Sequence, residues 1–196
     1  QSDFATRIAS LDPTQKMVVD MLKERAETRL EWKSSPEGAD PCHPPPLRML
    51  LIGTAGTGKT YTAKAGITEA RLMLESYDSV LTMAFTGVAA ANLGVGSKTI
   101  DSVFHTNRAD ALDNLTGDSL DNLVSELESV ESLVIDEIST CGAAALEVVS
   151  RRMQQVARVL WRRKFKREPP DHLSPFGGIG VLLMGDFAQP PPVMST

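Results

Sequence analysis

The stretch Leu50-Leu-Ile-Gly-Thr-Ala-Gly-Thr-Gly-Lys-Thr60 decides the fold of this chain of 196 residues. A short apolar strand breaks into Gly53-x-x-x-x-Gly58-Lys59-Thr60, and sequence compatible with a helix follows. Glycines let the backbone fold so that loop N–H groups converge on phosphate oxygens at the positive end of a helix dipole. The pattern predicts a phosphate-binding loop formed by Gly53, Thr54, Ala55, Gly56, Thr57, Gly58, Lys59 and Thr60. A tight turn with a solvated lysine is the alternative interpretation.

A second half of the site is predicted at Leu133-Val-Ile-Asp-Glu137. An apolar run of this kind is typical of a strand buried on both faces of a parallel sheet, and α/β sheets bind ligands at the carboxyl ends of such strands. Asp136 would hold Mg²⁺ through the metal's water shell, and Glu137 would orient or deprotonate the water that attacks the γ-phosphate. In the loop, Lys59 can reach the β- and γ-phosphates and the Thr60 hydroxyl can ligate Mg²⁺. An acidic pair closing an ordinary strand is the alternative to an ATPase core that uses ATP and Mg²⁺.

The composition is that of a globular domain. Hydrophobic residues make up 42% of the chain, enough for one good core, and no apolar stretch approaches the length that spans a bilayer. The N-terminus lacks a signal-peptide pattern. The two cysteines, Cys42 and Cys141, lie far apart, and Cys42-His43 has no further ligands with zinc spacing, so we expect ordinary loop residues there. A reduced intracellular protein without a membrane partner is the simplest interpretation.

The net charge of −5 hides a basic cluster between residues 151 and 167. This stretch has no acid and holds eight of the twenty basic residues, namely Arg151, Arg152, Arg158, Arg162, Arg163, Lys164, Lys166 and Arg167. A local basic patch can bind a phosphate backbone even when the whole chain is acidic. A solvated helix face, whose basic end suits the helix dipole, explains the same residues. The sequence leaves both interpretations open.

Predicted strands and helices alternate around these anchors. Strands are expected at 47–52, 80–86, 133–136 and 179–184, and helices at 13–32, 59–75, 101–108, 119–128 and 143–164. The alternation predicts a three-layer α/β fold with a mainly parallel sheet. We divide the chain into an N-terminal helical segment at 1–33, a proline-rich loop at 34–46 and an α/β domain at 47–196.

Several short stretches, taken together, resemble the first motor domain of superfamily 1B DNA helicases of the petite-integration-frequency (PIF) family. They are Gly53-Thr-Ala-Gly-Thr-Gly-Lys-Thr60, Phe85-Thr-Gly-Val-Ala-Ala90, Val134-Ile-Asp-Glu-Ile-Ser139, Phe176-Gly-Gly178 and Gly185-Asp-Phe-Ala-Gln-Pro-Pro-Pro-Val193. The resemblance covers nearly the whole chain and implies a RecA-like P-loop NTPase domain. Helicases carried by rolling-circle transposons share these motifs.

The resemblance implies roles for four further residues. Gln15, in Leu11-Asp-Pro-Thr-Gln15, would hydrogen-bond the adenine edge, because an amide both donates and accepts. Gln189 would sense the γ-phosphate and couple it to DNA, as a third residue of the catalytic set with Lys59 and Glu137. Thr86 and Gly87 would contact the backbone of single-stranded DNA. The alternatives are a helix-surface residue for Gln15, a proline-stiffened loop residue for Gln189, and a strand-to-helix turn at Thr86 and Gly87.

The chain also departs from the family pattern. The family often has Thr-Ile-His-Ser where this chain has Thr99-Ile-Asp-Ser102, so the usual histidine role is in doubt, and His105 is expected to be a helix residue. Ala188 and Pro190 replace a bulkier aromatic and a leucine. The second RecA-like domain, which by resemblance supplies arginines to the ATP site, is expected to be absent from these residues.

The resemblance implies an ATP-dependent DNA helicase that moves 5′ to 3′ on single-stranded DNA and unwinds duplexes, with roles in DNA repair, recombination or telomere maintenance. A nuclear location, a mitochondrial alternative and a monomeric state are further expectations. Two other functions stay open. One is a RecD-like or relaxase-linked P-loop ATPase, and the other is a transposon-derived helicase remnant without catalysis.

Overall fold

The computed structural model describes residues 8–33, 46–169, 173–186 and 188. The predicted proline-rich loop lies outside these ranges except for Pro46, and Cys42, His43 and Gln189 lie outside them as well. No helix in the described ranges has both the length and the apolar character that crossing a bilayer would need.

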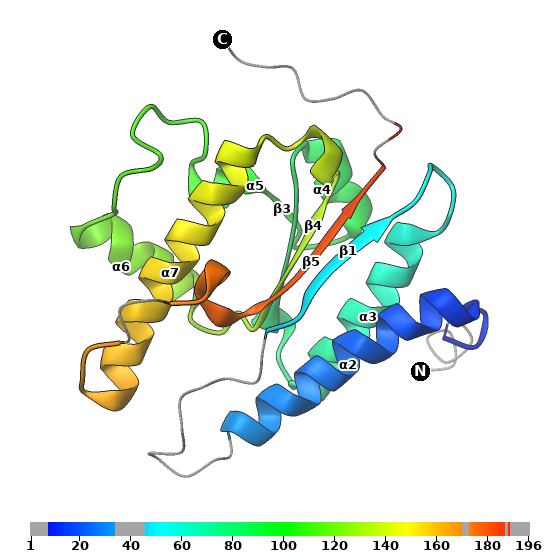
Figure 1. Ribbon diagram of the computed structural model, residues 1–196, viewed down its shortest axis with the longest axis horizontal. Coiled ribbons are helices and arrows are strands. Elements are labelled where there is room, and N and C mark those ends of the chain that lie inside the picture. Colours follow the sequence, from blue (N-terminus) through cyan, green and yellow to red (C-terminus); the bar gives the residue numbers. More distant parts are fainter. Residues whose placement is uncertain (1–7, 34–45, 170–172, 187, 189–196) are drawn as a thin grey trace.

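Five parallel strands form one sheet within the described residues, in the order β1-β5-β4-β2-β3 (Figure 1). The strands are β1 (Arg48–Ile52), β2 (Val80–Ala84), β3 (Lys98–Thr99), β4 (Ser132–Asp136) and β5 (Gly180–Gly185). Because every strand runs in the same direction, the carboxyl ends of β1, β5, β4 and β2 meet at one edge of the sheet. The predicted parallel α/β architecture is confirmed.

Helices cover the two faces of this sheet. They are α2 (Pro13–Lys33), α3 (Lys59–Met73), α4 (Gly87–Leu93), α5 (Ile100–Phe104), α6 (Gly117–Leu127) and α7 (Ala143–Phe165), with 3-10 turns η1 (Tyr77–Ser79), η2 (Ile138–Thr140) and η3 (Pro175–Gly178). Buried residues of α2, α3 and α4 share one core, and those of α5, α6 and α7 share the other. The molecule therefore has three layers, with α2 and α3 on one side of the sheet and α6 and α7 on the other (Figure 1).

The central strand β4 shows why its sequence is apolar throughout. Val134 belongs to the core under α2 and α3, whereas Leu133 and Ile135 belong to the core under α7, and none of the three is exposed. Successive side chains of a strand point to opposite faces, so a strand covered on both faces needs an unbroken apolar run. Burying each such side chain stabilises the fold by roughly 1.5–3 kcal/mol.

Helix α2 begins at the predicted Asp12-Pro13 pair. The Gln15 backbone N–H donates to Asp12 Oδ1 over 2.9 Å, and the Asp12 N–H donates to Gln15 Oε1 over 3.1 Å, which is a reciprocal capping box. Further along, Leu22 lies so close to Gly66 of α3 that a Cβ on Gly66 would be 2.5 Å from Leu22 Cδ1. The capping box fixes the start of α2, and the close approach of Leu22 and Gly66 packs the middle of α2 against the middle of α3.

The far end of α2 is tied to the sheet by buried arginines. Arg29 Nε donates to Glu131 Oε2 over 2.5 Å, just before β4 begins, and Arg25 donates to the carbonyl oxygen of Gly178. Burial, followed by repulsion from Arg29, lowers the pKa of Arg25 to about 10. The N-terminal helix is thus part of the same packed body as the sheet.

The segment that follows β2 differs from the prediction. Helix α4 and strand β3 were not expected, and the helix predicted at 101–108 ends at Phe104 as α5. The reason is a cap: His105 adopts a left-handed conformation (φ 53°), and Asp101 Oδ1 accepts hydrogen bonds from Thr106 Oγ1 and the Asn107 N–H. His105 is therefore not a helix residue, and Asp101, where the family often has histidine, organises this turn.

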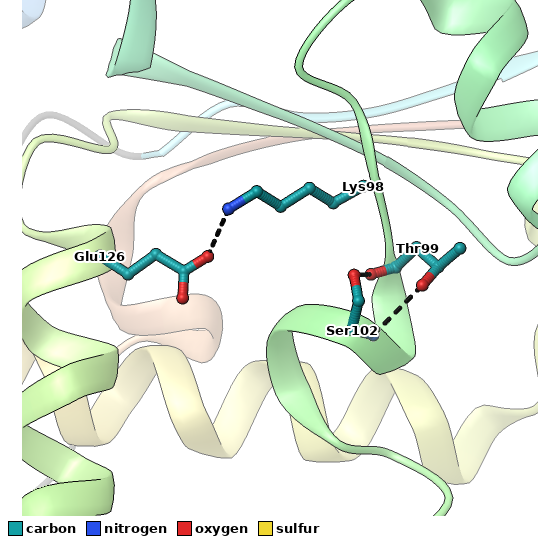
Figure 2. A network of polar contacts seen from close by, with 4 residues as sticks. All are labelled: Lys98, Thr99, Ser102 and Glu126. Atoms are coloured by element: carbon teal, nitrogen blue, oxygen red, sulfur yellow. Dashed lines mark hydrogen bonds and ion pairs between the residues drawn. The ribbon is translucent and has the colours of Figure 1, made fainter.

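Strand β3 and helix α5 are held by a small polar network (Figure 2). Lys98 Nζ lies 2.6 Å from Glu126 Oε1 of α6, and Thr99 Oγ1 caps α5 by accepting a hydrogen bond from the Ser102 N–H over 3.2 Å. The first contact joins β3 to α6 and the second caps α5, so both have a structural role.

Candidate nucleotide-binding site

The predicted phosphate loop connects β1 to α3. The Gly53 N–H donates to the Gly185 carbonyl at the end of β5, which anchors the loop to the neighbouring strand. Gly58 stands just before α3 in a left-handed conformation (φ 81°), and no side chain caps the helix. A residue with a Cβ disfavours this conformation. The first N–H groups of α3 are therefore available to phosphate oxygens, as a phosphate-binding loop requires.

The Lys59 side chain lies across the loop. Its Nζ donates to the carbonyl oxygens of Gly53 over 2.5 Å and Thr54 over 2.9 Å. An ammonium group has three hydrogens, and the third has no acceptor among the described residues. The positive charge thus stands at the loop, next to the exposed residues 54–57 where phosphates would bind.

Thr60 and Asp136 come together from different elements. Thr60 Oγ1 in the first turn of α3 donates to Asp136 Oδ2 at the end of β4, over 3.3 Å. Asp136 is 8% exposed, and its other oxygen accepts the Glu137 N–H over 2.8 Å. Mg²⁺ is commonly held by one or two protein oxygens together with substrate phosphates and water. A hydroxyl and a carboxylate beside a phosphate loop fit that requirement.

Glu137 follows Asp136 in an unusual backbone conformation. Its φ of 56° and ψ of 39° lie in the left-handed region, which is uncommon for a residue with a side chain and is enriched at functional sites. Glu137 Oε2 accepts a hydrogen bond from Thr86 Oγ1 over 2.9 Å. Thr86 also caps α4, because its Oγ1 accepts the Ala89 N–H over 3.2 Å. The predicted strand-to-helix turn is therefore present, with exposed Gly87 as the first residue of α4.

Gln15 reaches the phosphate loop from α2. Its Nε2 donates to the Thr57 carbonyl over 3.4 Å, and a Cβ on Gly58 would lie 2.7 Å from the same Nε2. Its Oε1 belongs to the capping box with Asp12. The half-buried Gln15 thus adjoins the site instead of pointing into solvent from the helix surface.

The end of β5 completes the arrangement. Asp186 is 9% exposed and accepts the Ala188 N–H over 2.9 Å. Gly185 packs on η2, where a Cβ would meet Ile138 Cγ2 at 2.7 Å. Gln189 lies outside the described residues, so its predicted role stays a prediction.

A family model described as PIF1-like helicase matches residues 45–196. The chain belongs to the PIF1-like helicase family. Its relatives include the ATP-dependent DNA helicase Pif1 of a Psychrobacter species, which is 35% identical over 162 residues, covering 75% of this chain and 20% of that protein. They also include the ATP-dependent DNA helicase RRM3 of Saccharomyces cerevisiae, which is 31% identical over 156 residues, covering 74% of this chain and 18% of that protein.

Solved structures of PIF1-like helicases have the same fold. Bacteroides Pif1 bound to single-stranded DNA matches with a TM-score of 0.54 and 26% identity over 89% of this chain and 34% of that one. The Bacteroides Pif1 helicase in complex with ADP-AlF3 and single-stranded DNA matches with a TM-score of 0.56 and 26% identity, over 88% of this chain and 34% of that one. The chain spans about a third of the length of these structures. The predicted RecA-like fold is confirmed.

The basic cluster is largely occupied within the PIF1-like domain. Arg151 pairs with Glu147, Arg162 with Glu168 and Arg163 with Glu128, while Arg167 stacks near Trp161 and Phe165. Arg152 is buried and donates to the carbonyl oxygens of Ala111 and Asp113. Arg152 is therefore a structural residue that fixes the loop after α5. For the exposed members of the cluster, both interpretations stay predictions.

One feature of the site escaped the sequence prediction. The contact between Thr86 and Glu137 joins a motif assigned to single-stranded DNA with a motif assigned to ATP hydrolysis. The residues around Thr86 alone do not predict this contact. A register argument could have found it, because Ala84 of β2 pairs with Asp136 of β4, so the residues that follow each strand emerge side by side.

Proposed function

We propose that this PIF1-like chain is the nucleotide-binding motor domain of an ATP-dependent DNA helicase, with Mg²⁺ as cofactor. The main support for this proposal is the hydrogen bond between Thr60 and Asp136 beside the phosphate loop, with Glu137 directly after Asp136 in the chain. The named relatives are ATP-dependent DNA helicases, and one related structure holds ADP-AlF3 together with single-stranded DNA.

We assign each residue of the site a part in nucleotide binding or hydrolysis. Gly53 anchors the loop through its N–H bond to the Gly185 carbonyl. Thr54, Ala55, Gly56, Thr57 and Gly58 present backbone N–H groups to the phosphates, and the Lys59 ammonium stabilises charge on the β- and γ-phosphates. Thr60 and Asp136 hold Mg²⁺, directly or through its waters, and the metal supplies neutralisation and orientation of the phosphate oxygens. Gln15 contacts the adenine edge, and Gln189 senses the γ-phosphate.

Glu137 acts on the attacking water. The water oxygen forms a bond to the γ-phosphorus, its proton passes to the Glu137 carboxylate, and the bond to the oxygen bridging the β- and γ-phosphates breaks. ADP leaves with that electron pair, and inorganic phosphate is the second product.

Single-stranded DNA is the proposed partner, contacted by Thr86 and Gly87. A structure of a related protein bound to single-stranded DNA supports this proposal. In the intact protein, we propose 5′ to 3′ translocation and duplex unwinding, with roles in repair, recombination or telomere maintenance, in the nucleus or in mitochondria and as a monomer. By resemblance, a second RecA-like domain supplies arginines to the ATP site. An arginine in that position raises the rate of phosphoryl transfer by about 10³–10⁵-fold.

The test is the Glu137→Gln variant of the 196-residue chain, compared with the unchanged chain by single-turnover hydrolysis of labelled ATP and by nucleotide titration. We expect slow hydrolysis by the unchanged chain, because it spans about a third of the length of the related structures and, by resemblance, the arginines belong to a second RecA-like domain. Glu137→Gln should bind ATP with unchanged affinity and lose the residual hydrolysis. Equal hydrolysis by both proteins would contradict the role of Glu137, and absence of ATP binding in the folded chain would favour a non-catalytic remnant.

A further inference from the structure

The hydroxyl of Thr86 has two protein partners and only one hydrogen. It accepts the Ala89 N–H over 3.2 Å, and it donates to Glu137 Oε2 over 2.9 Å. The directions are fixed by chemistry, since a backbone N–H can only donate and an ionised carboxylate can only accept. The single hydroxyl hydrogen is therefore donated to the Glu137 carboxylate, which we propose as the acceptor of the water proton.

Glu137 is restrained at both ends. Its backbone N–H donates to Asp136 Oδ1 over 2.8 Å, its φ of 56° lies in a sparsely populated region, and its side chain ends on Thr86. The other carboxylate oxygen, Oε1, has no hydrogen-bond partner within the described ranges. The contact with Thr86 is thus the one side-chain restraint on Glu137 that the described residues supply.

Thr86 also belongs to the segment for which we propose the DNA contact. Both Thr86 and Gly87 are exposed at the carboxyl edge of the sheet. The oxygens of a DNA phosphate only accept hydrogen bonds, so a phosphate bound by the Thr86 hydroxyl must take the hydrogen that Glu137 receives here. One hydroxyl hydrogen cannot serve both acceptors at full strength.

We propose that Thr86 is a positioning residue whose hydroxyl restrains Glu137 until a DNA phosphate takes the hydroxyl. This inference rests on the proposed function and adds a coupling device to it. Without DNA, the hydrogen bond holds the carboxylate on the Thr86 side. When the strand binds, the carboxylate is released to orient and deprotonate water, so that hydrolysis responds to DNA through a direct contact between the two motifs.

The experiment measures hydrolysis of labelled ATP under single-turnover conditions without DNA, at saturating protein, for the chain and for Thr86→Val. Valine has a similar shape to threonine and lacks the hydroxyl. We expect the DNA-free rate to rise severalfold in Thr86→Val with unchanged ATP affinity, and an oligothymidine to raise it no further. Thr86→Ser, which keeps the hydroxyl, should restore the low DNA-free rate.

A matched control separates this effect from loss of a helix cap. Thr99 caps α5 as Thr86 caps α4, accepting the Ser102 N–H over 3.2 Å, but within the described residues its side chain and its carbonyl oxygen both accept from Ser102 in its own turn (Figure 2). Thr99→Val should leave the DNA-free rate unchanged, whatever it does to the melting temperature. In the double variant Thr86→Val/Glu137→Gln the increase should disappear, because it acts through Glu137.

A DNA-free rate of Thr86→Val that equals or falls below that of the unchanged chain would overturn the inference, provided that Glu137→Gln is inactive. The same holds if Thr99→Val gives an equal rise. Equal rates for Glu137→Gln and the unchanged chain would instead overturn the assignment of Glu137 in the proposed function, which distinguishes the two failures.

Discussion

Thr60 Oγ1 of α3 lies 3.3 Å from Asp136 Oδ2 of β4, so that the phosphate loop and the central strand are joined at one point. The two residues are 76 positions apart in the chain. They meet because α3 starts at the end of β1 and because β1 and β4 are parallel neighbours of the same strand, β5. The pair is where we place Mg²⁺.

Replacing Asp136 with Asn should remove the magnesium-dependent part of ATP binding. The amide keeps the shape but loses the charge, and changes around metal ligands typically cost about 10–100-fold in metal affinity. We expect ATP affinity measured with Mg²⁺ to fall to the level measured with EDTA. Asp121→Asn, on the exposed face of α6, is the matched control and should retain the full response to Mg²⁺. A full response in Asp136→Asn would show that the metal lies elsewhere.

Breaking the Arg29–Glu131 pair should destabilise the fold strongly. The side chains are 10% and 5% exposed, so Glu131→Gln removes a buried carboxylate charge that faces the Arg29 guanidinium. Loss of one partner of such a pair costs about 3–5 kcal/mol, whereas an exposed pair contributes about 0–1 kcal/mol. Glu126→Gln removes the partner of Lys98, where the side chains are 45% and 39% exposed, and should cost little. Urea unfolding compares the two, and equal losses would contradict the account.

Gly177 is predicted to be intolerant of a side chain. Its φ is +65°, and a Cβ would lie 2.5 Å from the Met153 carbonyl oxygen and 2.9 Å from Ala157 Cβ of α7. Forced overpacking costs about 1–3 kcal/mol, and the left-handed backbone adds about 1–2 kcal/mol. Gly142 has φ −68° with nothing near the Cβ position, so Gly142→Ala should change the free energy of unfolding by less than about 0.5 kcal/mol. Similar thermal stability of the two variants would show that η3 packs differently.

Cys141, which ends η2, should resist alkylation in the native protein. Burial raises the pKa of its thiol from 9.0 to about 11, so at pH 8 the reactive thiolate is on the order of 10²-fold rarer than in the unfolded chain. Because the folded pKa is the higher one, this contribution to stability is complete below pH 9 and is lost as the pH rises through about 11. The measurement is iodoacetamide labelling of a Cys42→Ser variant with and without urea. Equally fast labelling in both conditions would contradict the burial of Cys141.

Much of the site could be predicted from sequence because the responsible signals are local. The glycine spacing from Gly53 to Gly58 and the apolar run that ends at Asp136 are each complete within a few residues. The parallel sheet then brings their ends to one edge. Thr60 and Asp136 could therefore be paired in advance, and the structure places their oxygens in contact.

The remainder depends on contacts that no local pattern contains. The helix predicted at 101–108 ends early because Asp101 caps the turn at His105, and a capping carboxylate resembles any acidic helix residue. Arg152 looks like its basic neighbours, yet it is buried against the loop after α5. The contact between Thr86 and Glu137 depends on the order of β2 and β4 in the sheet, which alternation of strands and helices does not specify.

The most direct test of the central claim, that these residues form a working ATP site, is titration of the chain with a fluorescent ATP analogue and Mg²⁺. The chain is compared with Lys59→Ala and with Lys23→Ala, an exposed lysine of α2, each in the presence and absence of a single-stranded oligonucleotide. We predict saturable binding by the chain and by Lys23→Ala, at least about tenfold weaker binding by Lys59→Ala, equivalent to about 1.4 kcal/mol, and a shift in affinity with DNA. Equal binding by Lys59→Ala, or no binding by the folded chain, would contradict the account.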